Sequence, residues 1–156
     1  MSKRLAHHAT FVIERLFKAP PSRVFHAFAD PAAKASWFAG PDEWEKIRQD
    51  FDFRVGGRER LSGGPKGGTA HSFEALYQDI VRNERIIYTY DMHLDDKRIS
   101  VSLATVEFKP EDGGTRLVIT EQGVFLDGYD DAGSREQGTH WLLTKLSASL
   151  HEPTPT

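Results

Sequence analysis

Residues 130–150 read DDAGSREQGTHWLLTKLSASL and form the only long stretch of the chain with a helical pattern. Carboxylates at its start and Pro153 beyond its end are typical of helix termini. An amphipathic helix has to bury its apolar face, and the rest of the chain offers only strands as a partner surface. We therefore predict that Leu143 and Leu146 are core residues. The apolar residues recur at steps of three and four, which predicts one broad buried face made of Trp141, Leu142, Leu143, Leu146 and Leu150.

Stretches rich in β-branched and aromatic residues precede this helix and are predicted to be seven strands. Between the first two strands, one short helix begins at Pro21 or Ser22, and Asp30-Pro31 ends it and caps a second short helix that runs to Phe38. Six consecutive strands joined by short turns favour an antiparallel meander, and one helix can cover so many strands only if the sheet curves around it. The predicted strands are 10–18, 44–53, 58–62, 69–81, 85–93, 98–109 and 115–125.

Composition limits the class of protein. With 156 residues, 38% of them hydrophobic and 28% charged, the chain is expected to form one globular domain over residues 1–156. A formal net charge of -3 gives no reason to expect nucleic acid as a partner. No apolar run is long enough for a signal-peptide core or a membrane span, so we expect a cytoplasmic protein without a membrane partner. The absence of cysteine excludes disulfides, thiolate nucleophiles and Cys-ligated zinc.

Motifs for metals, cofactors and catalysis are missing from the sequence. Seven histidines are scattered without the HExxH spacing. Asp127, Asp130 and Asp131 lack the pattern of a calcium loop and are better explained by helix capping. The glycine-rich loop 63–68 lacks both P-loop and Rossmann spacing, which indicates a plain hairpin loop with a dispensable Lys66. No GxSxG motif occurs. We therefore predict no metal site and no cofactor, and we assign no catalytic residue.

Five stretches carry a resemblance that covers nearly the whole chain. They are APPSRVFHAFADPAAKASWF at 19–38, FDFRVGG at 51–57, ERIIYTYDM at 84–92, GGTRLVITEQGVF at 113–125 and GTHWLLTKLSASL at 138–150. In these stretches the chain resembles the SRPBCC (START/Bet v 1-like) superfamily, specifically its activator of Hsp90 ATPase homologue branch. The resemblance implies an α+β helix-grip fold, in which a curved seven-stranded antiparallel sheet wraps a long C-terminal helix and two short helices lie between strands 1 and 2. This element order agrees with the one predicted from the residues themselves.

The resemblance also implies a cavity between sheet and helix, which in related proteins holds apolar or aromatic small molecules. Strand alternation places Tyr88, Tyr90 and Met92 on one face of their strand. The alternative for each aromatic residue is ordinary core packing, and for Glu121 it is an exposed or salt-bridged position. A buried carboxylate or phenol needs a partner, so an unpartnered one facing a cavity would be a candidate for ligand contact or proton transfer. The candidate ligand-binding residues are Trp37, Phe38, Trp44, Phe51, Tyr88, Tyr90, Met92, Glu121, Trp141 and Leu142.

Three classes of function follow from the resemblance. We expect a small-molecule binding protein with an apolar cavity for a hydrophobic or aromatic ligand. The first alternative is an enzyme similar to polyketide cyclases and aromatases, which would require Glu121, His71 and Tyr88 to converge inside the cavity, whereas an all-apolar lining would favour binding. The second alternative is a co-chaperone that regulates the Hsp90 ATPase. It is disfavoured because the family's eukaryotic activators carry an additional amino-terminal domain, and only nine residues precede the first predicted strand here.

Overall fold

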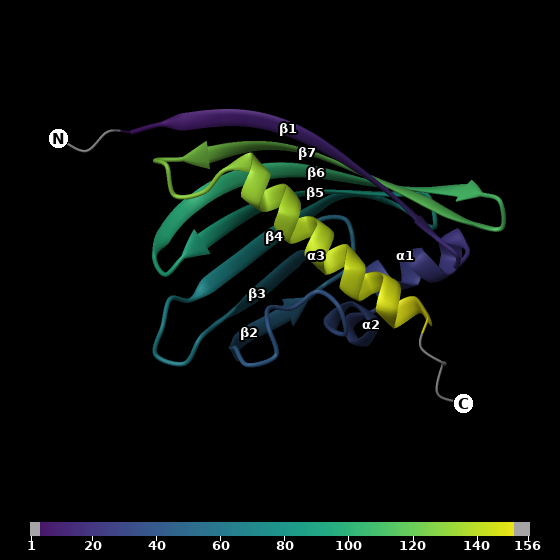
Figure 1. Ribbon diagram of the computed structural model, residues 1–156, viewed down its shortest axis with the longest axis horizontal. Coiled ribbons are helices and arrows are strands. Elements are labelled where there is room, and N and C mark those ends of the chain that lie inside the picture. Colours follow the sequence, from purple (N-terminus) through teal and green to yellow (C-terminus); the bar gives the residue numbers. More distant parts are fainter. Residues whose placement is uncertain (1–3, 152–156) are drawn as a thin grey trace.

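The computed structural model describes residues 4–151 and consists of one antiparallel sheet with a long helix across its concave face (Figure 1). The strands follow the order β1-β7-β6-β5-β4-β3-β2, so β2 to β7 form a meander and β1 pairs with β7. This confirms the predicted helix-grip fold. The elements are β1 (Ala6–Phe17), α1 (Pro21–Ala29), α2 (Pro31–Ala35), β2 (Glu45–Phe51), β3 (Arg58–Gly64), β4 (His71–Val81), β5 (Arg85–Leu94), β6 (Lys97–Glu111), β7 (Gly114–Leu126) and α3 (Ala132–His151).

Several predicted boundaries differ from the structure, and for the strands the pairing partners account for the difference. β1 begins at Ala6, before the predicted start at Thr10, since its first residues pair with the end of β7 up to Leu126. The second short helix ends at Ala35 rather than Phe38. β3 continues to Gly64, so the predicted glycine-rich loop is shorter than its sequence suggests.

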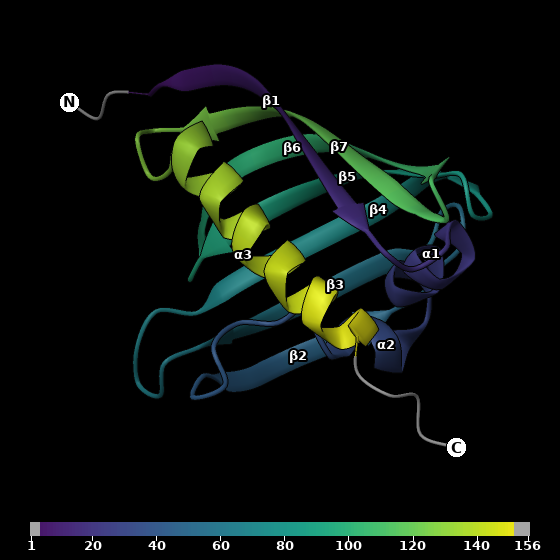
Figure 2. The same cartoon turned by 45° about the vertical axis from the view of Figure 1, so that its right-hand side comes forward.

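The two short helices are stabilised by their first residues. Pro21 occupies the first turn of α1, where its missing N–H and fixed φ fit a helix start. Asp30 caps α2, since its carboxylate accepts a hydrogen bond from the Ala33 N–H at 2.9 Å. The face of α1 that includes Phe25 and Phe28 is buried against the sheet. These helices therefore close one end of the molecule (Figure 2).

α3 lies across the sheet and is anchored mainly by its second half (Figures 1 and 2). Asp131 caps its start by accepting from the Ser134 N–H at 2.8 Å. Leu143 and Leu146 are 1% and 0% exposed, which confirms that they are core residues. The predicted apolar face is too broad, however, because Trp141 is 47% exposed. No helix within residues 4–151 is long and apolar enough to cross a membrane.

Candidate functional site

A cavity of about 550 Å³ lies between the sheet, the first half of α3 and the segment that follows α2. Its walls therefore come from parts of the chain that are far apart in sequence. The lining is mainly aromatic and aliphatic, with several polar side chains among them. It includes Trp37, Phe38, Trp44, Leu61, His71, Phe73, Tyr88, Tyr90, Met92, Ile119, Glu121, Arg135, Trp141 and Leu142.

The inward-facing residues of β6 are large at the closed end of the molecule and small towards the cavity. At the closed end of the molecule, β6 presents Phe108, whose ring lies 5.4 Å from the rings of Phe25 and Phe28 in α1. Towards the cavity, the same face of β6 carries the small buried residues Ser102 and Ala104. Ala104 packs in one cluster with Phe73 and Tyr90, and these two larger residues line the cavity. The sheet and α3 are thus packed together at one end and separated by the cavity at the other.

Aromatic rings form a connected wall of the cavity. The ring centroids of Phe38 and Phe73 are 5.0 Å apart, and those of Phe73 and Tyr90 are also 5.0 Å apart. Trp37 continues the wall from Phe38 at 5.6 Å, and Tyr88 continues it from Tyr90 at 5.8 Å. Such edge-to-face and tilted pairs are favourable and hold the rings in fixed positions. The wall is therefore ordered without a ligand.

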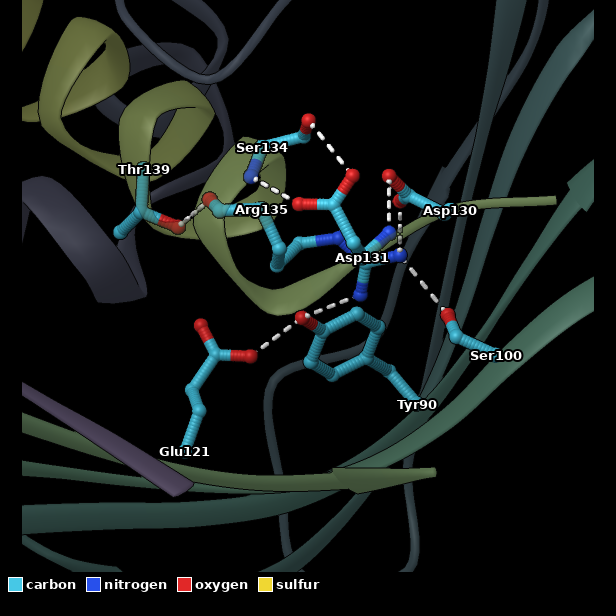
Figure 3. Close-up of polar contacts among 8 residues, drawn as sticks. All are labelled: Tyr90, Ser100, Glu121, Asp130, Asp131, Ser134, Arg135 and Thr139. Carbon is cyan, nitrogen blue, oxygen red and sulfur yellow. Dashed lines mark hydrogen bonds and ion pairs between the residues drawn. The ribbon is translucent and has the colours of Figure 1, made fainter. Parts of the chain in front are cut away.

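A chain of polar groups runs from α3 to the floor of the cavity (Figure 3). The Arg135 guanidinium donates to the hydroxyl of Tyr90 at 3.1 Å, and this hydroxyl in turn donates to the Glu121 carboxylate. Arg135 also donates to Ser100 Oγ at 2.8 Å and to Asp130 Oδ2 at 2.9 Å. The Arg135–Asp130 ion pair thereby fixes the guanidinium at the inner end of the cavity.

Burial changes the protonation of the groups at this inner end. Desolvation raises the pKa of Glu121, while the hydrogen bond from Tyr90 and the charge of Arg135 oppose this rise. Burial also raises the pKa of Tyr88, and the nearby Glu121 carboxylate adds to the effect. Both changes favour the protonated, uncharged form of the side chain.

Two polar atoms of these residues remain free to contact a ligand. Neither the second carboxyl oxygen of Glu121 nor the hydroxyl of Tyr88 has a hydrogen-bond partner within residues 4–151, and Figure 3 shows the free oxygen of Glu121. No fully buried side-chain nitrogen or oxygen of these residues lacks a partner, so the two unpartnered atoms are not fully buried. Both residues line the cavity, so the two free atoms reach its open space.

The mouth of the cavity is bordered by two tryptophans from opposite sides. Trp44 stacks on His71 with ring centroids 4.5 Å apart. Trp141 lies on α3, with the Lys145 ammonium 4.7 Å from its ring centre. Lys145 also donates to the backbone oxygen of Ala39 at 3.3 Å, which joins α3 to the segment after α2. The width of the mouth therefore depends on contacts between these two elements.

The structure brings together all the predicted site residues except Phe51. Phe51 lies at the end of β2 and packs against Phe53 at 5.8 Å, with the Lys34 ammonium 5.1 Å from its ring centre. It belongs to a neighbouring part of the core and does not line the cavity. His71 does line it, so Glu121, His71 and Tyr88 share one cavity, although His71 is held at the mouth by Trp44.

Sequence reasoning missed Arg135, which reads as an ordinary charged residue of a helix surface. A signal was present, because Arg135 precedes Leu142 by seven residues and such spacing places both on the same helix face. In the structure both line the cavity. A charged residue on the apolar side of a helix is a candidate for a buried polar contact.

A buried ion pair beside the cavity was also missed. The Lys34 ammonium contacts the Glu59 carboxylate at 2.5 Å, and the Tyr77 hydroxyl donates to the same oxygen at 2.7 Å. Burial lowers the pKa of Lys34, and the charge and hydrogen bond of Glu59 oppose this change. The pair links α2 to β3 and thus positions the segment that carries Trp37 and Phe38. The sequence contains a signal for this burial, because Glu59 lies two residues before Leu61 and therefore on the same face of the strand.

Metal binding has no evident site in the part of the chain described. Within residues 4–151, no group of three or more His, Asp or Glu side chains could hold a metal ion. The hydrogen-bonded groups around Arg135 and Tyr90 include two carboxylates, Glu121 and Asp130, and Asp130 is paired with Arg135.

A curved antiparallel sheet that grips a C-terminal helix, with two short helices after the first strand, defines the helix-grip class of the SRPBCC superfamily. Within it, the chain belongs to the Activator of Hsp90 ATPase homolog 1-like protein family, whose model matches residues 18–151. This confirms the resemblance noted in the sequence. A comparison with curated proteins gave no match.

Similar solved structures come from bacteria. An uncharacterised protein from Rhizobium leguminosarum is 52% identical, with a TM-score of 0.90 over 95% of this chain and 97% of that one. The Mll3558 protein from Rhizobium loti is 45% identical, with a TM-score of 0.87 over 93% of this chain and 99% of that one. The CV1439 protein from Chromobacterium violaceum is 29% identical, with a TM-score of 0.78 over 92% and 98%. These similarities support the same fold along the whole described chain.

Proposed function

We propose that this chain is a small-molecule binding protein whose cavity takes a hydrophobic or aromatic molecule. The observation that carries the proposal is the cavity of about 550 Å³ with its connected aromatic wall. Its volume falls within the range of about 300–1,000 Å³ typical of small-molecule sites. Aromatic side chains supply much apolar contact area to a ligand, and their mutual packing reduces the entropy lost on binding.

The test is titration with an uncharged solvatochromic dye such as Nile red. A dye inside the cavity should become fluorescent and quench tryptophan emission, because Trp37, Trp44 and Trp141 all line the cavity. Met92→Ala and Trp141→Ala should weaken dye binding several-fold, since each removes apolar contact area from the lining.

Tyr129→Ala provides the matched control. Tyr129 is 43% exposed, close to the 47% of Trp141, but it does not line the cavity. Its removal should leave dye affinity unchanged. Absence of dye binding, or an equal loss of affinity in the Tyr129 variant, would contradict the proposal.

A second candidate is an enzyme similar to polyketide cyclases and aromatases. The observation that favours it is the polar chain of Arg135, Tyr90 and Glu121 inside a cavity that also contains His71 and Tyr88. Such groups could move protons on a bound carbonyl compound. Incubation with linear poly-β-ketone compounds should then yield aromatic products, and Glu121→Gln should abolish the reaction. A third candidate, regulation of an Hsp90 ATPase, rests on the family description alone.

A further inference from the structure

We propose that the inner end of the cavity recognises an uncharged oxygen-bearing group of the ligand, a ketone or a hydroxyl, through the free carboxyl oxygen of Glu121 and the hydroxyl of Tyr88. This inference rests on the binding function proposed above and adds the chemical class of the ligand's polar end. Glu121 is 5% exposed and faces the cavity with one oxygen unpartnered among the described residues. A carboxyl oxygen that has no protein partner and faces a cavity is available for a hydrogen bond to a ligand.

The sheet register places the two free groups on either side of a small residue. Tyr88 of β5 pairs with Ala104 of β6, and Ala104 pairs with Glu121 of β7. Neighbouring strands are about 4.8 Å apart, so the backbones of Tyr88 and Glu121 are separated by about 10 Å. Ala104 is the residue between them in the register of this face. Since Tyr88 and Glu121 both line the cavity, a ligand oxygen at its inner end can approach both side chains.

The balance of charge favours an uncharged ligand group. Asp130 neutralises Arg135 through their ion pair at 2.9 Å. Burial raises the pKa of Glu121, which favours the neutral acid there. Since the Tyr90 hydroxyl donates to one oxygen of Glu121, the other oxygen of the acid can carry the proton and donate it to a ligand.

Charged ligand groups are disfavoured by the same residues. An ammonium group at this position would lie near the Arg135 cation, and a carboxylate would find the charge of Arg135 already paired with Asp130. Each would also lose its hydration in a cavity of low dielectric constant, which costs more than the transfer of a carbonyl or hydroxyl group. The ligand's polar end is therefore a hydrogen-bonding group without charge.

The groups around Glu121 lead to a defined pH dependence. Tyr88 and Tyr90 face it from β5 and Arg135 faces it from α3, and all three keep one protonation state near neutral pH. Its cross-strand neighbours in β1 and β6, Phe11 and Ala104, do not titrate. Asp130 is paired with Arg135, and the other titratable residues of the lining are Asp42, Glu45, Lys46, His71 and Lys145.

The experiment compares naphthalene probes that differ only in one substituent, by displacement of the dye from the full chain. At the acidic end of the pH range in which the chain stays folded, the ketone 2-acetonaphthone should bind at least about tenfold more tightly than its hydrocarbon isostere 2-isopropylnaphthalene, which corresponds to the gain from one or two hydrogen bonds. The preference should decrease as the pH rises and Glu121 loses its proton. Tighter binding of 2-naphthoate or of 2-(aminomethyl)naphthalene than of the ketone would overturn the proposal.

Three variants assign the effect to residues. Glu121→Gln keeps an uncharged donor, so it should retain the preference for the ketone and lose the pH dependence. Glu121→Leu should abolish the preference while the hydrocarbon still binds, and Tyr88→Phe should reduce the preference several-fold. An unchanged preference in Glu121→Leu, or a pH dependence that persists in Glu121→Gln, would overturn the proposal.

The hydrocarbon probe separates this inference from the function on which it rests. If 2-isopropylnaphthalene binds and the ketone shows no advantage, only the recognition of a polar end is wrong. If neither probe binds, the proposed binding function is wrong and the inference falls with it.

Discussion

At the scale of single residues, Glu121 makes the stability of the fold depend on pH. Its pKa is raised by burial in the folded chain, whereas in the unfolded chain it has the ordinary value of about 4.3. The folded state therefore binds more protons between these two pKa values. The contribution of this group to stability is fully present below about pH 4.3 and is lost as the pH rises through the folded pKa.

We predict that Glu121→Gln becomes more stable relative to the natural chain as the pH rises from about 4.3. Urea unfolding of both proteins across this range measures the difference in free energy of unfolding. Glu74→Gln is the control, because Glu74 is an exposed residue of β4 and should give a difference that does not change in this way. A constant difference for Glu121→Gln would show that its carboxyl group titrates alike in both states.

The buried Lys34–Glu59 pair gives a second prediction at this scale. Glu59→Gln leaves the Lys34 ammonium without its counter-charge and should cost about 3–5 kcal/mol of unfolding free energy. Asp50→Asn removes the partner of Arg48 in an exposed pair at the same N–O distance of 2.5 Å, and it should cost about 0–1 kcal/mol. Chemical unfolding compares the two variants. Equal costs would mean that burial does not determine the strength of these pairs.

At the scale of elements, α3 combines a packed half with a half that covers the cavity. Leu146→Ala should cost about 2–5 kcal/mol, because Leu146 is 0% exposed and lies in the main core. Gln137→Ala, on the exposed side of the same helix, should change the unfolding free energy by less than about 0.5 kcal/mol. Thermal or urea unfolding provides the measurement. An unchanged midpoint for Leu146→Ala would contradict this placement of the packed half.

In the β3–β4 hairpin, we expect the side chain of Lys66 to be dispensable and Gly64 to be required. Lys66→Ala should have little effect on stability, because Lys66 is exposed in the connection between the strands. Gly64→Ala should destabilise the chain, since a Cβ there would lie 2.2 Å from the backbone oxygen of Thr69. The comparison of their unfolding midpoints is the test. Similar midpoints would show that the hairpin backbone moves easily to admit a methyl group.

The order of these elements could be predicted from the sequence because hydrophobic period and turn residues are local signals. Boundaries were less predictable: β1 extends to Ala6 only because β7 offers a pairing partner as far as Leu126. Strand alternation placed Tyr88 and Tyr90 of the aromatic wall on one face, whereas Phe73 was not among the predicted site residues. The role of Arg135 was not predicted, since its buried contacts come from β5 and β6, which lie far away in the sequence.

At the scale of the whole molecule, the cavity itself was implied by family resemblance, and the aromatic residues of separate segments indicated the end of the molecule where it lies. Small buried residues such as Ala104 occur in well-packed cores and therefore do not by themselves indicate a cavity. Whether such residues lie beside a cavity or in a packed core depends on which side chains lie next to them on the neighbouring strands. That arrangement depends on the register of the full sheet.

The contrast between the packed end and the hollow end has a thermodynamic consequence. At the packed end, Phe25, Phe28 and Phe108 complete the core with the chain's own side chains. At the hollow end, a bound molecule would take the place of those missing side chains. Any compound that binds only the folded chain adds RT ln(1 + [L]/Kd), about 2.7 kcal/mol at a hundred times its Kd, to the free energy of unfolding. The melting temperature of the protein is thus a readout of occupancy, and a library of unlabelled compounds can be screened by it.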